Sequence, residues 1–270
     1  MSMDIFLFEI ILVSFLGLCL GSFATAITWR VPQGISWIGG WGSTKKHQRS
    51  QCTHCGHALS FIDLIPVFSW LFCKGKCRHC KKKIRARYLM IELLSLIACL
   101  CLYLAYGFDM TSVALFLIVP FLLALFFIDI DHFILPNQLV FIVGILAIFY
   151  HGILFFTTPT YGIGLLLYYG LSAVIFGLFS WVIGVVMSFV LKKDALGFGD
   201  VKFFAVSGLW LGISYLPYYL IAAGGIGVLW AVIVQIITKK KGYFPFGPAL
   251  ILCFFSAIII KGFGIVPLVH

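Results

Sequence analysis

Long uninterrupted runs of apolar residues constrain the fold of this chain more than any other feature. A helix that crosses a bilayer needs about 20 mostly apolar residues. Eight runs of roughly this length cover residues 5–29, 88–108, 112–130, 138–157, 163–191, 201–216, 218–238 and 247–264. Transmembrane β-strands would instead alternate apolar and polar residues over about ten positions. We therefore predict an all-α polytopic membrane protein with about eight transmembrane helices.

The amino-acid composition agrees with this fold class. Of the 270 residues, 62% are hydrophobic and only 10% are charged, whereas soluble domains have about 45–50% apolar and about 25% charged residues. This composition excludes a soluble enzyme and a disordered chain.

The basic residues indicate how the chain is oriented. Twelve of the 19 Lys and Arg residues lie between Arg30 and Arg87, in the one long polar stretch. Cytoplasmic loops of membrane proteins carry an excess of Lys and Arg. If this stretch is cytoplasmic, eight spans place 18 basic residues on that side and only Lys261 on the other. In this interpretation the net charge of +10 reflects the orientation of the chain in the membrane and the contact of its basic groups with the lipid bilayer. We therefore expect no nucleic-acid partner.

The same distribution divides the chain into three parts. We predict a first transmembrane helix at residues 1–29, a cytoplasmic basic loop at 30–87, and a seven-helix membrane core at 88–270.

Five of the nine cysteines lie in the basic loop, and four of them form two C-x-x-C pairs. The pairs are Cys52–Cys55 and Cys77–Cys80, with 21 residues between them. Two such pairs supply four thiolates for a tetrahedral Zn²⁺ site, at a spacing close to that of zinc ribbons. A reducing cytoplasm favours metal over a disulfide; redox-active pairs and unmetallated thiols are the competing interpretations. We predict a zinc-ribbon-like insertion with a closed, structural site, and we leave Cys73 outside it.

Carboxylates at membrane depth are the candidates for chemistry, because ionisable groups there are costly and usually functional. Asp200 ends the segment Gly197-Phe198-Gly199-Asp200, and Asp129 and Asp131 end the third apolar run. In the predicted topology all three lie on the cytoplasmic side. A pair of carboxylates can activate water for attack on a peptide carbonyl. Asp129 and Asp131 are about 200° apart around a helix, so only one faces Asp200, and periodicity leaves open which.

Several motifs in a fixed order resemble one family, the bacterial type IV prepilin peptidases, which are GxGD aspartyl proteases of the membrane. The segments that carry the resemblance are Gly17–Phe23, Trp29–Pro32, the two cysteine pairs with Asp63–Leu71 between them, Arg87–Leu94, Asp129–Asn137, Gly197–Asp200 and Pro245–Pro248. Two positions depart from the family pattern: Ala24-Thr25 replaces a residue followed by Asn, and Leu89 replaces a proline.

The resemblance implies an activity and assigns roles to residues. It implies an endopeptidase that cleaves the leader peptide of type IV prepilins and pseudopilins at the cytoplasmic face of the inner membrane. It also implies methylation of the new N-terminus with S-adenosylmethionine. Asp129 and Asp200 would be the catalytic aspartates, and their motifs are supported by Pro136, Asn137, Gly197 and Gly199. The residues that bind the methyl donor stay unassigned, because the sequence contains no G-x-G-x-x-G after a strand.

Two other interpretations stay open at this point. The chain could be a GxGD protease of the presenilin or preflagellin-peptidase kind, although these lack the long four-cysteine loop. It could also be a non-catalytic membrane assembly factor or transporter with a zinc-ribbon docking loop, in which the aspartates relay protons or cations.

Overall fold

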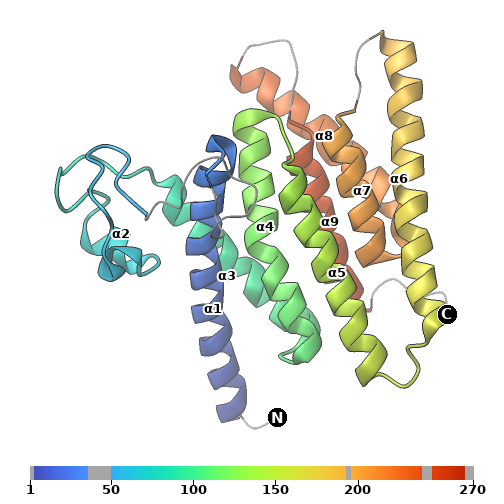
Figure 1. Ribbon diagram of the computed structural model, residues 1–270, viewed down its shortest axis with the longest axis horizontal. Helices are drawn as coiled ribbons and strands as arrows, with labels where there is room; N and C mark the ends of the chain where they lie inside the picture. The colour runs from blue at the N-terminus through green and yellow to red at the C-terminus, as the bar shows by residue number, and fades with distance from the viewer. Residues whose placement is uncertain (1–2, 36–49, 193–195, 239–244, 265–270) are drawn as a thin grey trace. The chain divides into compact units, whose positions relative to one another are not determined.

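The computed structural model describes residues 3–35, 50–192, 196–238 and 245–264, and these residues are mostly helical (Figure 1). The helices are α1 (Met3–Arg30), α2 (Phe68–Phe72), α3 (Arg87–Tyr106), α4 (Met110–His132), α5 (Asn137–Thr157), α6 (Ile163–Leu191), α7 (Phe198–Leu211), α8 (Leu216–Thr238) and α9 (Gly247–Gly262). The all-α prediction is confirmed, and each predicted apolar run contains a helix. The short helix α2 lies inside the polar stretch. The run Lys239–Lys241, which the charge argument used, lies outside the described residues.

In the part of the chain that the structure describes, six helical segments are long and apolar enough to cross a bilayer, so the chain is a multi-pass membrane protein. Two of the eight apolar helices are shorter: α7 has 14 residues and α9 has 16. At 1.5 Å per residue they are about 21 and 24 Å long, less than the roughly 30 Å of a hydrocarbon core. The apolar run predicted at 201–216 is divided, because Gly212 adopts a left-handed φ of 86° and ends α7.

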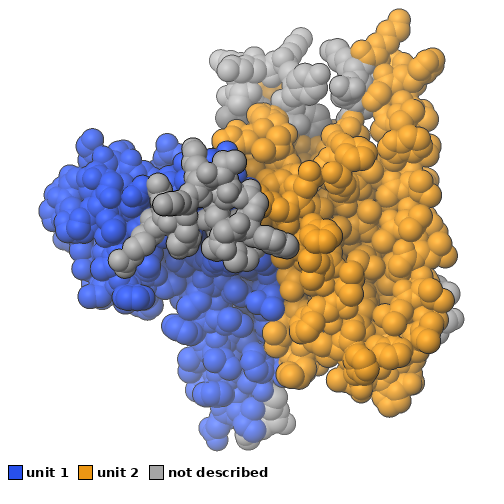
Figure 2. Space-filling model, in the orientation of Figure 1, with its two compact units in different colours: residues 1–108, 116–124 blue, residues 109–115, 125–270 orange. Residues whose placement is uncertain are grey.

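The chain forms two compact units, coloured separately in Figure 2. The first contains residues 1–108 and 116–124, and the second contains residues 109–115 and 125–270.

In the first unit α1 and α3 are packed antiparallel at close range through two glycines of α1. A Cβ added to Gly21 would lie 2.6 Å from Cα of Glu92, and one added to Gly17 would lie 3.0 Å from Cα of Leu96. Small residues four positions apart let membrane helices approach each other in this way. The Gly17–Gly21 segment therefore sets the distance between α1 and α3.

In the second unit α7 packs against α5, α6 and α9. The indole N–H of Trp210 in α7 donates to the carbonyl of Val143 in α5 at 3.0 Å. At the end of α7, Lys261 of α9 donates to the carbonyl of Trp210 at 2.7 Å, and a cation suits the C-terminal end of a helix. These contacts fix the depth of α7 within the second unit.

We expect Gly21→Ala to destabilise the protein, because the new methyl group would overlap the backbone of α3. Overpacking of this kind costs about 1–3 kcal/mol. Reversible unfolding in mixed micelles measures the change in the free energy of unfolding. The matched control is Gly152→Ala in α5, where an added Cβ would meet no atom within 4 Å. An equal effect of both substitutions would contradict the close approach of α1 and α3.

Candidate functional site

Asp129 lies in the last turn of α4 and is buried, with 5% of its surface exposed. Its carboxylate oxygen Oδ2 accepts a hydrogen bond of 3.0 Å from the backbone N–H of Gly247, the first residue of α9. A Cβ on Gly247 would lie 2.7 Å from that oxygen. Only a glycine leaves room at this position for the carboxylate of Asp129.

Asp200 lies in the first turn of α7 and is partly buried. Its Oδ2 accepts a hydrogen bond of 3.2 Å from the backbone N–H of Gly197, the residue that precedes the helix. A carboxylate in the first turn satisfies a backbone donor that the helix leaves unpaired and is favoured by the helix dipole. The predicted GxGD segment therefore forms the N-terminal cap of α7.

Leu135 lies between the two carboxylate segments and brings them together. A Cβ on Gly199 would lie 3.1 Å from Cβ of Leu135, and one on Gly247 would lie 3.1 Å from Cδ2 of the same side chain. Contacts through Leu135 thus bring together the two segments that carry Asp129 and Asp200, although 71 residues separate these aspartates in the sequence.

The second oxygen of each carboxylate is available for chemistry. Among the described residues, Oδ1 of Asp129 and Oδ1 of Asp200 have no hydrogen-bond partner. Two neighbouring carboxylates, each held by one oxygen, can bind a water molecule between their other oxygens. One can then accept a proton from the water while the other donates a proton to a carbonyl.

The structure separates Asp131 from Asp129. Asp131 is exposed, whereas Asp129 is buried, as expected for two residues about 200° apart on one helix. The packing of α4 therefore gives these two carboxylates different environments.

The segment after α4 links it to α5 and then to α7. Phe133 ends α4 with a left-handed φ of 57°, Pro136 is the N-cap of α5, and Asn137 is its first residue. Oδ1 of Asn137 accepts a hydrogen bond of 2.9 Å from the ammonium of Lys202 in α7. The ammonium also lies 4.8 Å from the ring centre of Phe198. Asn137 and Lys202 therefore join the start of α5 to the start of α7.

Sequence reasoning did not assign site roles to Gly247, Leu135 or Lys202. Gly247 belongs to the segment Pro245–Pro248, which had contributed to the family resemblance without a role. Leu135 and Lys202 lie close in sequence to the two aspartates, but proximity of this kind does not indicate which contacts they make.

The second candidate site is the predicted four-cysteine cluster, whose four residues the structure brings together. The sulfur atoms of Cys52, Cys55, Cys77 and Cys80 all lie within 4.8 Å of one another. The sulfurs of Cys52 and Cys80 are 3.9 Å apart, and tetrahedral zinc with Zn–S bonds of 2.3 Å requires about 3.8 Å. The cluster therefore has the donor set and the spacing of a zinc site.

The two cysteine pairs are built by the same turn. The N–H of Gly56 donates to the carbonyl of Cys52, and the N–H of Lys81 donates to that of Cys77. Gly56 and Lys81 both have a left-handed φ, of 70° and 58°. An isolated β-bridge closes each turn, Gln51 with Ala58 and Lys76 with Lys83, and the described residues contain no longer strand.

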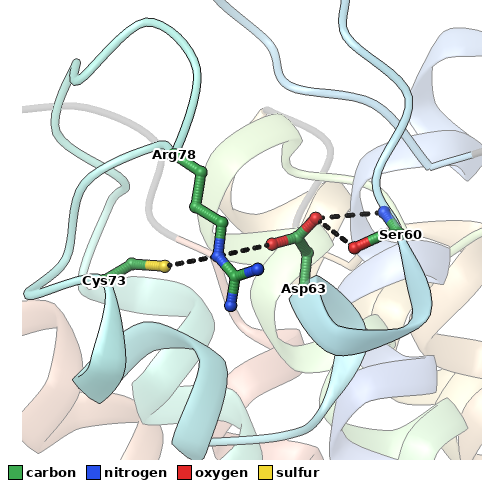
Figure 3. Close-up of polar contacts among 4 residues, drawn as sticks. All are labelled: Ser60, Asp63, Cys73 and Arg78. Carbon is green, nitrogen blue, oxygen red and sulfur yellow. Dashed lines mark hydrogen bonds and ion pairs between the residues drawn. The ribbon is translucent and has the colours of Figure 1, made fainter.

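Cys73 lies outside the cluster and takes part in a polar contact that supports the second cysteine pair (Figure 3). The guanidinium Nε of Arg78 lies 3.4 Å from the sulfur of Cys73 and 3.3 Å from Oδ1 of Asp63. The hydroxyl of Ser60 donates to Oδ2 of Asp63 at 2.7 Å and lowers the pKa of Asp63. Asp63 therefore connects the segment between the cysteine pairs to the second pair.

Comparison with known proteins gives consistent matches along the chain. The profile described as the Bacterial Peptidase A24 N-terminal domain matches residues 15–106, and that of the Type IV leader peptidase family matches residues 116–232. The chain is 33% identical over 250 residues to the "Type 4 prepilin-like proteins leader peptide-processing enzyme" of Escherichia coli O78:H11, covering 87% of each protein. It is 28% identical over 249 residues to the "Prepilin leader peptidase/N-methyltransferase" of Vibrio cholerae, covering 91% of this chain and 94% of that protein. No solved structure gives a significant match.

We expect Cys77→Ser to remove metal from the loop, because zinc needs all four thiolates to close its tetrahedral shell. Structural zinc supplies about 10–16 kcal/mol to the folding of small sites, so the loop should also become sensitive to proteases. Metal analysis of the purified protein and limited proteolysis between residues 50 and 86 measure both effects. Cys73→Ser is the matched control and should retain the metal. Equal metal loss in both variants would mean that Cys73 is a ligand.

We expect Lys202→Met to weaken the link between α5 and α7. A hydrogen bond to a charged group contributes about 1.5–3 kcal/mol to the free energy of unfolding. Because Lys202 is partly exposed, we expect a decrease near the lower end of this range. The free energies of unfolding of three variants complete a double-mutant cycle with the wild type: Lys202→Met, Asn137→Ala and the variant with both substitutions. We expect a coupling energy of about 1 kcal/mol between the two side chains. The exposed Lys192→Met is the control. Additive effects of the two substitutions would exclude the Asn137–Lys202 contact.

Proposed function

The chain belongs to the type IV leader peptidase family, and we propose that it is a membrane aspartyl endopeptidase that removes the leader peptide from type IV prepilins and pseudopilins. It also methylates the N-terminus that this cleavage exposes. The observation that carries the peptidase assignment is the pair formed by Asp129 and Asp200, with one oxygen of each held by a backbone N–H.

The two aspartates carry out hydrolysis as a general base and a general acid. One carboxylate accepts a proton from water as the water oxygen attacks the scissile carbonyl carbon. The other, protonated, carboxyl donates its proton to the carbonyl oxygen, which gives a tetrahedral intermediate. The carboxyl group that accepted the proton from water then donates it to the nitrogen. The C–N bond breaks and releases the new amine, while the former carbonyl oxygen returns its proton to the other carboxylate. The hydrogen bonds from Gly247 and Gly197 orient the carboxylates, and the Oδ1 atoms face the water.

The substrate is held mainly by its apolar helix. The chain is itself strongly basic, so charge alone does not attract a basic leader. Packing of the apolar segment of a prepilin among the membrane helices instead supplies most of the affinity. Gly197 and Gly199 carry no side chains, which lets an extended substrate backbone approach Asp200 closely.

The active site faces the cytoplasm, and the membrane is the bacterial inner membrane. The support for this orientation is the positive-inside distribution of the basic residues. Asp129 at the end of α4, Asp200 at the start of α7 and Gly247 at the start of α9 lie at one end of the second unit. In the predicted topology this end is the cytoplasmic one.

Two further groups complete the proposed enzyme. A structural Zn²⁺ would be held by Cys52, Cys55, Cys77 and Cys80, because four thiolates would fill the coordination positions of the ion and leave none for a substrate. S-adenosylmethionine, when bound, supplies the methyl group for the second activity.

We expect Asp129→Asn and Asp200→Asn each to lower the rate of leader cleavage at least a thousandfold, because each removes one partner of the acid–base pair. This corresponds to about 4 kcal/mol of activation free energy. The measurement follows leader loss from a synthetic prepilin by mass spectrometry, using purified enzyme in detergent with S-adenosylmethionine present. A further mass increase of about one methyl group on the wild-type product reports methylation.

Asp131→Asn is the matched control, since Asp131 is exposed two residues from Asp129. It should cleave at a rate within a few-fold of wild type. Normal cleavage by both Asp129→Asn and Asp200→Asn would exclude the aspartyl mechanism and favour a non-catalytic assembly factor. An unmethylated wild-type product would leave a peptidase without the second activity.

A further inference from the structure

A cavity of about 460 Å³ lies within the first unit, between the ends of α1 and α3 and the four-cysteine loop. Its volume falls in the range of about 300–1,000 Å³ that is typical of small-molecule sites. Side chains from α1 and α3 line one part of it, among them Thr25, Trp29, Tyr88 and Glu92, while loop residues line the rest. All the residues that line the cavity belong to the first unit, whereas Asp129 and Asp200 belong to the second.

Glu92 is a buried carboxylate in the wall of this cavity and has no cationic partner. Only 9% of its surface is exposed, and its Oε2 accepts a hydrogen bond of 2.6 Å from the backbone N–H of Val67. Among the described residues, no Lys, Arg or His forms an ion pair with it. A buried charge is costly unless it is paired. Glu92 therefore indicates a ligand that brings a positive charge into the cavity.

Aromatic side chains in the same wall suit a cationic and partly planar ligand. Trp29, Trp70 and Tyr88 all line the cavity. Aromatic faces attract cations and stack on planar rings. The indole N–H of Trp70 is buried and has no hydrogen-bond partner among the described residues, so a donor is available for a ligand acceptor.

The loop side of the cavity has the opposite charge. Lys82, Lys83 and Arg85 line it and are exposed. Arg30 at the end of α1 is a buried cation on the helix side, and Asp63 is a carboxylate on the loop side that pairs with Arg78. The cavity thus combines one buried carboxylate that lacks a cationic partner, Glu92, with a surplus of basic groups. A ligand that matches this arrangement has a cationic part and a carboxylate at a short distance from each other.

We propose that this cavity binds S-adenosylmethionine, with its cationic sulfonium and ammonium groups near Glu92, its carboxylate toward the basic loop side, and its adenine against the aromatic residues. This assignment rests on the methyltransferase part of the proposed function. In this proposal the zinc loop has a second role, in binding the ligand, because it forms part of the cavity wall.

Other ligands fit the cavity less well. The phosphate of an anionic lipid would use the basic groups but would leave Glu92 unpaired. The basic leader of a prepilin would pair with Glu92 but would be repelled by the loop side. Only a ligand with both charges satisfies both sides.

The test is equilibrium binding, measured by calorimetry on the full-length, zinc-loaded protein in nanodiscs. Glu92→Gln keeps an acceptor for the N–H of Val67 and removes the charge. It should weaken the binding of S-adenosylmethionine at least tenfold, because a charged hydrogen-bonded partner is lost. Binding of 5′-methylthioadenosine, which lacks both cationic groups and the carboxylate, should be unchanged by the same substitution.

The matched control is Glu9→Gln. Glu9 is a carboxylate of α1 that accepts a hydrogen bond from Tyr103 of α3 and does not line the cavity. Glu9→Gln should bind S-adenosylmethionine as wild type does, and both variants should still cleave prepilin. Wild-type affinity in Glu92→Gln, or equal weakening in Glu9→Gln, would overturn this site while leaving methylation by the wild-type enzyme intact. A wild-type protein that neither binds nor uses S-adenosylmethionine would overturn both the site and the methyltransferase function.

Discussion

The absence of water from the hydrocarbon core of a bilayer is the constraint on which the rest of this structure depends. Every backbone N–H and C=O at that depth needs a partner within the protein, and α-helices provide it locally. Helix association then relies on close packing rather than on the hydrophobic effect. Gly17 and Gly21 allow that packing between α1 and α3, and Gly208 allows it between α7 and α6, where an added Cβ would lie 2.6 Å from the carbonyl oxygen of Ser172. Glycine positions consequently decide where helices meet.

Glycines also allow close approach at the aspartate site, where this approach brings a backbone donor to a carboxylate. Gly247 lets α9 approach α4 closely enough for its N–H to bind Asp129, and Gly199 lets α7 approach Leu135. Each carboxylate is oriented by a backbone donor at the start of a helix, where such donors lack a partner within the helix. Two short helices, α7 and α9, supply these donors.

The polar loop of the first unit is stabilised differently from the membrane helices, because it is too small to build a hydrophobic core. Its order comes from the four sulfurs, from the two matching turns and from the contact of Asp63 with Arg78. The C-x-x-C spacing alone predicts the cluster, since each pair is a local turn. The contact of Cys73 with Arg78 could not be predicted in this way, because it depends on how the segment between the pairs folds back.

The amino-acid sequence by itself determined the helical membrane fold, the positions of the eight apolar helices and the four-cysteine cluster, because hydropathy and local spacing act over a few turns of chain. Hydropathy and motifs narrowed the candidate carboxylates to Asp129, Asp131 and Asp200. Helical periodicity left Asp129 and Asp131 equivalent, and only the family resemblance favoured Asp129. Only the tertiary structure decided that Asp129 is buried against Gly247, that Lys202 binds Asn137, and that Glu92 faces a cavity without a cationic partner. These contacts join residues far apart in the chain, and only the packing of whole helices determines which side chains meet.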